Sequence, residues 1–430
     1  IVGNVTTSAD GQGTLTFSTT AANTTLVSGN VGVAGTGALL VLNAGAATGI
    51  TGSFAGNVNA DTFNISNTAA DGEIAVAGDI TAATGTIFTA DGILVLNGTG
   101  AQTITGSITQ STGADDRGDI SVTNTAGTVT VANALGATAA NGGLGNLTTA
   151  ANTTTVFNST VDAENGSLSG TSTFKGAVTL DGTVALGNGS KIILDTGVVQ
   201  GTTVITAAGA ITDGAAVAIE LADNRILADG QSITVVDAGS GTTDGTYTVL
   251  DTALFDYSVA ISDANDTVIV SAAKRNTAAI AASIGVSTVE AAALDSASTA
   301  LASGDDVALS ALNTALVAGG ATAKAATQQI AVQTDTLGAG AAASAGTGAA
   351  ASGTTATRLA MLRTGDQYAN ATNSMASGFN TGDSSHALST AVWMKPFGSD
   401  GDQDDVGTIA GFETSTLGIA GGIDTAVSKE

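Results

Sequence analysis

The only histidine of the chain, His386, lies in a short run of residues whose types could form a hydrolytic site. Asp383, Ser384 and Ser385 stand just before it, so an acid, a nucleophile and a base are all present. Serine catalysis needs these side chains to face one another, which neighbouring residues of one linker rarely do. The sequence also lacks the GxSxG, HExxH and phosphate-loop motifs. We therefore expect that the protein is not an enzyme and has no catalytic residues.

Acidic clusters are the second feature that could bind a ligand. They lie at 115–116, 263–266 and 305–306. A calcium ion needs about six to eight oxygen ligands that converge from several groups, and none of these clusters has EF-hand spacing or a nonapeptide calcium repeat. Asp305 and Asp306 precede a predicted helix, where negative charge is favourable. We expect no cofactor and no metal site, with calcium in the acidic turns as the alternative.

The composition excludes other classes of function. The net charge is −26, and 31 of the 37 acidic residues are Asp, a residue typical of turns and helix caps. Such a surface repels phosphate backbones, so we expect no nucleic-acid partner. The absence of Cys excludes disulfides and thiolate chemistry. No apolar run of about 18 residues predicts a membrane-spanning helix. No signal peptide is visible at Ile1, where we expect the sequence to begin inside a longer chain.

Residues 1–200 consist of short alternating runs of Val, Thr and Ile, broken by Gly, Asn and Asp, a pattern that predicts β-strands. The segment is also repetitive, since 38–54 resembles 92–108 at an offset of 54 residues. An offset of this length would hold about two coils of a solenoid. We therefore predict a mainly β fold, with a right-handed parallel β-helix over 1–200 that is incomplete at its N-terminus. A β-sandwich array is the alternative, although it would leave more open strand edges.

The pattern changes over 201–275, where the strands are longer and Asp-Gly turns separate them. Tyr247, Phe255 and Tyr257 fall in this segment. A solenoid needs a capped end, because its last coil is otherwise an open edge. We predict that 201–275 caps the β-helix and that these three aromatic residues drive the folding of the cap. Lys274 and Arg275 then follow as an exposed basic pair, which could be a processing site or could simply end the cap.

Alanine dominates 276–385, and the β alternation disappears there. The spacing of apolar residues and the Gly and Asp residues that flank them predict helices over 277–301, 307–318 and 321–337. The low-complexity stretch 338–355 predicts a flexible linker, and 356–375 predicts one more helix. We interpret the whole segment as an Ala-rich helical linker.

The C-terminal segment, 386–430, alternates with a period of two residues. Its distinctive residues are Trp393, Pro396, Phe397, Gly398, Asp402, Gln403, Gly411, Phe412 and Asp424. Together with the order of the preceding parts, these residues resemble the start of the β-domain of bacterial autotransporters, the proteins of type V secretion. The chain is most similar to rickettsial surface antigens of the outer membrane protein B type, since 226–257 looks like the end of their passenger. The resemblance implies an outer-membrane β-barrel, of which only two strands fit before Glu430.

The two faces of the last strand differ in this segment. Leu417, Ile419 and Ile423 fall on one face, and small or polar residues fall on the other. This alternation is typical of a transmembrane β-strand whose apolar residues face lipid. Trp393 and Phe397 would suit an aromatic girdle at the membrane interface.

The resemblance implies a non-enzymatic protein on the surface of a Gram-negative bacterium, anchored in the outer membrane by the C-terminal barrel. The β-helix would be displayed as a rod for adhesion to host or neighbouring cells, or for self-association into a surface layer. The alternative is a surface-layer or filament subunit without a barrel, in which 392–430 adds a strand to a neighbour's sheet.

Overall fold

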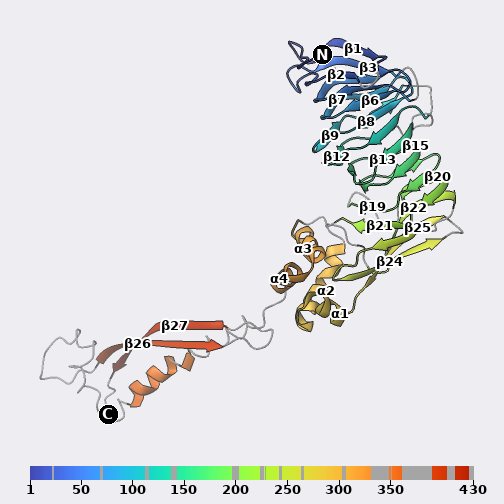
Figure 1. Cartoon of the computed structure of the whole chain (residues 1–430). Helices are drawn as coiled ribbons and strands as arrows, with labels where there is room; N and C mark the ends of the chain where they lie inside the picture. Colours follow the sequence, from blue (N-terminus) through green and yellow to red (C-terminus); the bar gives the residue numbers. More distant parts are fainter. Residues whose placement is uncertain are drawn as a thin grey trace, which may run out of the picture. The chain divides into compact units, whose positions relative to one another are not determined.

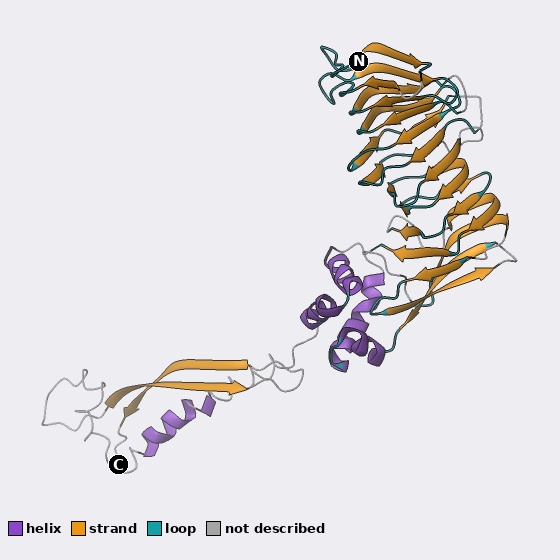
Figure 2. Ribbon diagram, in the orientation of Figure 1, coloured by secondary structure: helices purple, strands orange, loops and turns teal. Residues whose placement is uncertain are grey.

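A computed structural model describes most of the chain, and its secondary structure is mainly β (Figure 1, Figure 2). The described residues are 1–21, 24–67, 71–111, 116–136, 143–195, 203–222, 227, 229–241, 245–262, 266–302, 307–330, 348–349, 351–360, 390–403 and 412–425. They form two compact units. The first consists of Ile1–Gly285 and Leu294–Ala326, and the second of Val286–Ala293 and Thr327–Glu430.

Two long sheets make up most of the first unit. The 12-stranded sheet contains β1 (Gln12–Thr19), β3 (Leu39–Ala46), β5 (Val58–Ile65), β7 (Ile80–Phe88), β9 (Gln102–Thr105), β10 (Ile108–Gln110), β12 (Thr128–Val131), β14 (Thr154–Phe157), β16 (Thr171–Phe174), β19 (Ser190–Leu194), β21 (Ala216–Leu221) and β23 (Thr246–Val249). The 13-stranded sheet contains β2 (Thr24–Val27), β4 (Thr51–Phe54), β6 (Glu73–Val76), β8 (Ile93–Leu96), β11 (Asp119–Val122), β13 (Leu144–Thr149), β15 (Val161–Leu168), β17 (Val178–Leu180), β18 (Val184–Leu186), β20 (Thr203–Asp213), β22 (Ser232–Gly241), β24 (Phe255–Ser262) and β25 (Thr267–Lys274).

The chain alternates between the two sheets. From β1 to β9, every odd-numbered strand lies in the first sheet and every even-numbered strand in the second. Apart from the pairs that β25 makes with β22 and β24, neighbouring strands within these two sheets run parallel, so that Gln12 on β1 lies opposite Leu39 on β3, and Leu39 lies opposite Ala60 on β5. We call the stretch of chain from one strand of a sheet to the next strand of the same sheet a pass. The backbone N–H and C=O groups of each pass form hydrogen bonds with those of the next pass. Figure 2 shows this succession of parallel strands along the first unit.

The repeat in the sequence does not follow this strand register. Leu40 lies on β3, whereas its counterpart in the repeat, Leu94, lies on β8. Because five strand-to-strand steps separate them, the two residues belong to different sheets. The offset of 54 residues, predicted to hold about two coils, covers two full alternations and one further strand, so the two similar segments do not occupy equivalent positions.

A column of asparagine side chains stabilises one set of turns in this unit. The Oδ1 atom of Asn4 accepts a hydrogen bond from the backbone N of Asn30 at 2.8 Å, and Asn30 accepts one from Asn57 N at 2.9 Å. Asn57 in turn accepts one from Asp79 N at 2.9 Å. Each of these side chains therefore joins one turn to the equivalent turn of the next pass. These bonds fix which residues lie opposite each other in the strands that follow.

A column of glycines runs beside these asparagines, one residue earlier in each turn. A Cβ at Gly56 would lie 2.7 Å from the carbonyl carbon of Gly29, so only glycine allows the turns to approach this closely. The signal in the sequence is the triplet GNV at 3–5, 29–31 and 56–58, followed by GDI at 78–80. The prediction of the β region did not use it.

Aliphatic side chains and a few aromatic rings fill the interior of the first unit. Leu42, Phe63 and Ile74 are fully buried. Phe157 on β14 lies opposite Phe174 on β16, and the two rings stack with their centroids 5.2 Å apart. Such a pair contributes about 0.5–1.5 kcal/mol beyond the burial of its surface, so the aromatic contacts reinforce the same register as the backbone.

Among the described residues, the sheets are followed by the helices α1 (Thr277–Ile284), α2 (Thr288–Ala302), α3 (Val307–Ala318) and α4 (Gly320–Ile330). Asn276 caps α1, because its Oδ1 accepts a hydrogen bond from Ala279 N at 2.9 Å. The single helix predicted over 277–301 is broken at Gly285, which ends α1 with a φ of 75°. Of the predicted linker 338–355, residues 348–349 and 351–355 are helical, and the helix continues to residue 360. The remaining residues of the linker lie outside the described ranges.

The second unit contains an antiparallel pair of long strands, which we call the C-terminal hairpin. It consists of β26 (Thr390–Gln403) and β27 (Phe412–Thr425). The register runs from Thr390 opposite Thr425 to Gln403 opposite Phe412. Two alternating strands were predicted for this segment, and both are present.

Candidate functional site

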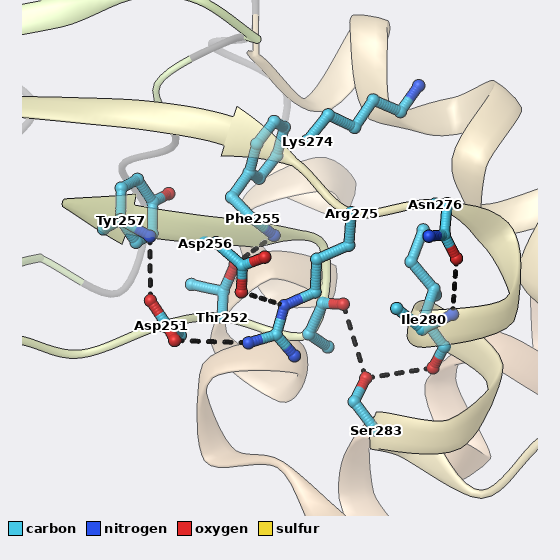
Figure 3. A network of polar contacts seen from close by, with 12 residues as sticks. Asp251, Thr252, Phe255, Asp256, Tyr257, Lys274, Arg275, Asn276, Ile280 and Ser283 are labelled. Atoms are coloured by element: carbon cyan, nitrogen blue, oxygen red, sulfur yellow. Dashed lines mark hydrogen bonds and ion pairs between the residues drawn. The ribbon is translucent and has the colours of Figure 1, made fainter.

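The C-terminal end of the 13-stranded sheet differs from the rest because its last strands are antiparallel. β25 pairs with β22, and β24 pairs with β25 from Phe255 opposite Lys274 to Ser262 opposite Thr267. In the described part of the chain, β24 is the last strand of this sheet. We call β24, β25 and the preceding loop 250–254 the end hairpin. Figure 3 shows the polar contacts that join it to α1.

Phe255 and Tyr257 lie on the buried face of β24. Phe255 is 1% exposed and Tyr257 is 7% exposed, and their ring centroids are 6.2 Å apart. The loss of solvent raises the pKa of Tyr257 to about 12, although the nearby Thr252 side chain and Leu227 backbone oppose this rise. The Tyr257 hydroxyl is buried and has no hydrogen-bond partner in the described part of the chain. The ring, rather than the hydroxyl, is therefore what stabilises this end.

Tyr247 lies apart from these two residues, on β23 of the other sheet. Its hydroxyl donates a hydrogen bond to Asp213 Oδ2 at 2.8 Å, and Asp213 is the last residue of β20. Burial, and then the bond to Asp213, raises the pKa of Tyr247. The structure therefore brings two of the three predicted cap residues together and places the third at a link between the two sheets.

The basic pair that was predicted to be exposed, Lys274 and Arg275, is partly buried and ion-paired. The Arg275 side chain is 19% exposed, with Nε 2.6 Å from Asp256 Oδ1 and Nη2 3.3 Å from Asp251 Oδ2 (Figure 3). Lys274 Nζ lies 2.8 Å from Asp295 Oδ1. The prediction of exposure was wrong, because acidic side chains from the end hairpin and α2 surround the pair. Processing at this pair stays a prediction, and a protease would first have to open these contacts.

Two residues that the sequence analysis did not select, Asp251 and Thr252, complete the end hairpin (Figure 3). Asp251 Oδ1 accepts a hydrogen bond from Tyr257 N at 2.8 Å, and Thr252 Oγ1 accepts one from Phe255 N at 3.1 Å. An Asp-Thr pair in a turn is a signal for side-chain bonds to nearby backbone. The sequence contains that signal, but not the strand to which the bonds are made.

The C-terminal hairpin has one exposed apolar face. On β27, Leu417 is 87% exposed and Ile419 and Ile423 are each 69% exposed, and less exposed residues alternate with them. Met394 on β26 lies opposite Gly421 and is 67% exposed, so it extends the same face. The face predicted for Leu417, Ile419 and Ile423 is therefore present.

The register of β26 and β27 shows which residues lie opposite two aromatic residues. Trp393 lies opposite Gly422, and Phe397 lies opposite Gly418. Because directly opposite residues of an antiparallel pair share a face, the side chain of Phe397 lies on the face away from Leu417. The ring of Phe397 covers Gly418 and leaves no room for a Cβ there. Phe397 therefore does not extend the exposed apolar face, and the aromatic girdle at a membrane interface stays a prediction.

The other predicted residues of the C-terminal segment have simpler positions. Pro396, Gly398 and Asp402 are exposed on β26, and Pro396 is tolerated because an edge strand needs fewer amide donors. The backbone of Gln403, Phe412 and Asp424 belongs to the two strands. Gly411 and the run from Asp383 to His386 lie outside the described residues.

The predicted acidic clusters are described only in part. Asp116 and Asp266 are described, with φ of 61° and 49°, whereas Asp115, Asp263, Asp305 and Asp306 are not. Within the described residues, no three acidic or histidine side chains converge in a way that could hold a metal ion. The calcium alternative stays a prediction.

Comparisons with known proteins do not assign this chain to a family, so a functional assignment depends on the contacts described above. The sequence matches no protein-family model, no curated protein and no solved structure. Among the described helices, none is long and apolar enough by itself to cross a membrane, and only α1 and the first part of α2, taken together as a bent pair, meet the criteria of length and composition.

Proposed function

We propose that the chain is a non-enzymatic cell-surface protein whose two parallel sheets form a displayed β-helical rod, as in the passenger of an autotransporter. The observation that carries this proposal is the alternation of consecutive strands between two parallel sheets, ended by an antiparallel hairpin. In a right-handed parallel β-helix, each coil contributes one strand to each sheet. The long sides of such a rod would offer area for adhesion to another cell or for lateral self-association.

The end hairpin supports a role in the folding of this rod. A stack in which each coil contacts only its neighbours needs a place where folding begins, after which coils can add one at a time. Phe255 and Tyr257 are buried in the end hairpin, and Arg275 is ion-paired with Asp251 of the loop and Asp256 of β24. We propose that this end folds first and provides the template on which the preceding coils assemble.

The C-terminal hairpin supports an anchor in an outer membrane. Each of its strands has 14 residues, which exceeds the roughly 9–11 residues that a tilted strand needs to cross a bilayer. Leu417, Ile419 and Ile423 would face lipid, and Phe397 with Gly418 would face the interior of a barrel. The alternative, a barrel-less subunit that assembles by strand addition, is supported by the outer edge of β26, which pairs with no other strand in the described part of the chain.

Surface display can be tested on intact cells because the chain contains no Cys. Thr125 is exposed in the turn after β11. In Gram-negative cells that produce the chain, we expect T125C to react with a membrane-impermeant maleimide and to need detergent for extraction. V122C, at a buried position of β11, is the matched control and should react only after denaturation. Reaction of T125C only after lysis would contradict display, and extraction without detergent would favour the barrel-less subunit.

A further inference from the structure

Asparagine followed by glycine is a pair of residues that can react without an enzyme. The backbone nitrogen of the glycine attacks the side-chain amide of the asparagine and closes a cyclic imide, a succinimide. Glycine favours this attack because it has no Cβ to obstruct its nitrogen. The chain contains four such pairs, at 97–98, 141–142, 165–166 and 188–189, and the second of them lies outside the described residues.

Asn97 directly follows β8 and is exposed, and its side chain makes no hydrogen bond within the described part of the chain. The nitrogen that would attack it belongs to Gly98, whose N–H donates to Gln102 Oε1 at 3.3 Å. That distance lies beyond the roughly 2.7–3.2 Å of an ordinary N–H···O bond. Both reacting groups, the amide of Asn97 and the nitrogen of Gly98, are therefore only weakly held.

Asn165 lies within β15 and is held by the neighbouring passes on both sides. Its Oδ1 accepts hydrogen bonds from Thr183 N at 2.8 Å and Thr183 Oγ1 at 2.9 Å, and its Nδ2 donates to Asn146 Oδ1 at 3.2 Å. The attacking nitrogen would be that of Gly166, which already donates to Thr183 O at 2.9 Å. The reaction at Asn165 would first have to break these bonds.

Asn188 is exposed, like Asn97, but it is bonded to the pass that follows. Its Oδ1 accepts a hydrogen bond from Ala216 N at 3.1 Å, and the nitrogen of Gly189 donates to Ala216 O at 2.7 Å. These two bonds hold both reacting groups in place. Exposure therefore does not distinguish Asn188 from Asn97, whereas hydrogen bonding does.

We propose that Asn97 is a site of spontaneous deamidation in the folded chain, and that hydrogen bonds between passes protect Asn165 and Asn188 from the same reaction. The Gly98 nitrogen loses its proton to solvent and bonds to Asn97 Cγ, the bond from Cγ to Nδ2 breaks, and ammonia leaves. One water molecule then opens the succinimide to aspartate or to isoaspartate, and no other reactant is needed. The inference does not depend on the proposed function, because it concerns the folded chain itself.

The isoaspartate product would disturb the turn between β8 and β9, because its main chain runs through the former side chain and gains a methylene group. Gln102, at the start of β9, is 1% exposed, and its Nε2 donates to Val76 O at 2.8 Å and to Gly78 O at 2.7 Å. A Cβ at Gly98 would lie 2.9 Å from Ala77 O, so the turn has little room for an added group. We expect the longer turn to displace Gln102 and weaken the contacts of this pass.

The test is ageing of the purified full chain in mild detergent at mildly alkaline pH, followed by mass spectrometry of its peptides. Electron-transfer fragmentation distinguishes isoaspartate from aspartate at each position. We expect Asn97 to convert at least about tenfold faster than Asn165 and Asn188, the factor that roughly one net hydrogen bond supplies. In chain unfolded by denaturant, the three sites should convert at similar rates, because a glycine follows each of them.

Two variants separate the reaction from its consequence. Asn97→Gln keeps a side-chain amide but would have to close a larger ring, which forms far more slowly, so no product should appear at position 97. Asn97→Asp, measured before ageing, carries the charge of aspartate without the added methylene group. Hydrogen exchange should show lost protection over β8 and β9 in the aged wild type, but not in aged Asn97→Gln or in fresh Asn97→Asp.

Conversion of Asn165 or Asn188 as fast as that of Asn97 in the folded chain would overturn the proposal. It would also be overturned if Asn97 converts in the unfolded chain but not in the folded chain. Unchanged protection in the aged wild type, or an equal loss in fresh Asn97→Asp, would overturn the effect assigned to the longer turn.

Discussion

The parallel strands from β1 to β20 and the end hairpin satisfy their backbone groups in different ways. Along the parallel strands, each pass bonds to the next, and small residues such as Gly56 allow close approach while Asn57 joins adjacent turns. At the end hairpin no further pass follows in the 13-stranded sheet of the described chain. There Asp251 and Thr252 bind the amides of β24, and Arg275 holds Asp251.

This difference indicates how stability is distributed in the first unit. A repeated contact can be lost at one level while the levels above and below it remain, because each level depends on its neighbours alone. The end hairpin has a buried aromatic pair, Phe255 and Tyr257, and one ion-paired arginine, Arg275. We therefore expect that substitutions in the end hairpin act on the whole end, whereas substitutions among the parallel strands act locally.

The largest effect is expected for Phe255→Ala. The side chain is 1% exposed, and truncation of a buried phenylalanine lowers the free energy of unfolding by about 3–5 kcal/mol. Hydrogen exchange monitored by mass spectrometry should show lost protection throughout β24 and β25. Phe157→Ala is the matched substitution among the parallel strands, and its loss of protection should centre on β14 and β16. If both variants lose protection over the same residues, the contrast between the two regions does not hold.

Gly56→Ala should have the next largest effect. It tests whether the turns between the parallel strands need glycine in order to approach one another closely. The added Cβ would lie 2.7 Å from the carbonyl carbon of Gly29, and such overpacking costs about 1–3 kcal/mol. Gly100→Ala is the control, because nothing lies within 4 Å of a Cβ at that exposed position. Denaturant unfolding should give a lower midpoint for Gly56→Ala than for Gly100→Ala. Equal midpoints would contradict the claim that only glycine allows these turns to approach so closely.

Tyr257→Phe tests the end hairpin through its pH dependence. The pKa of Tyr257 is raised from 10.0 to about 12 by burial, so the folded state holds the phenolic proton more tightly than the unfolded state does. The free energy of unfolding should therefore fall as the pH rises from about 10 to about 12, by roughly 1.4 kcal/mol for each pH unit. Tyr257→Phe should be at least as stable as the wild type at pH 7 and should lack this part of the alkaline loss. If the free energy of unfolding of Tyr257→Phe falls with pH as steeply as that of the wild type, the alkaline loss of stability comes from other groups.

Asp119→Asn should have the smallest effect and addresses the parallel strands. Burial, with a smaller contribution from the charge of Asp91, raises the pKa of Asp119 despite the hydrogen bonds from Asn146. An acid whose pKa is raised in the folded state lowers the free energy of unfolding as the pH rises above its ordinary pKa of 3.8, so the charged form is unfavourable at neutral pH. Asp119→Asn keeps the Oδ1 acceptor and should gain up to about 0.5 kcal/mol at pH 7. Thermal unfolding at pH 4 and pH 7 should show the gain only at pH 7, and a loss at pH 7 would contradict this explanation.

The sequence was sufficient for features set by local chemistry. Alternation of Val, Thr and Ile predicted the β regions, and the Ala-rich segment predicted helices, because both patterns depend on neighbouring residues. Gly285 shows the limit of that reasoning. A single glycine within an Ala-rich pattern is compatible with a continuous helix, and only its left-handed conformation shows that α1 ends there.

Features that depend on register could not be predicted in the same way. The similarity of Leu40 and Leu94 suggested equivalent positions, but turns of unequal length place them in different sheets. The face of Phe397 could not be predicted, because its partner, Gly418, depends on where the connection between β26 and β27 turns. Asp251 was missed for a related reason, since its role is defined by a strand edge that local sequence does not mark.

The central claim is that the end hairpin folds first and templates the parallel strands. Pulsed hydrogen exchange during refolding of the full chain, read by mass spectrometry, tests it most directly. The account predicts that amides of β22, β24 and β25 become protected before those of β1 to β9, and that Phe255→Ala delays protection in both regions. Protection of β1 to β9 first, or at an unchanged rate in Phe255→Ala, would contradict it.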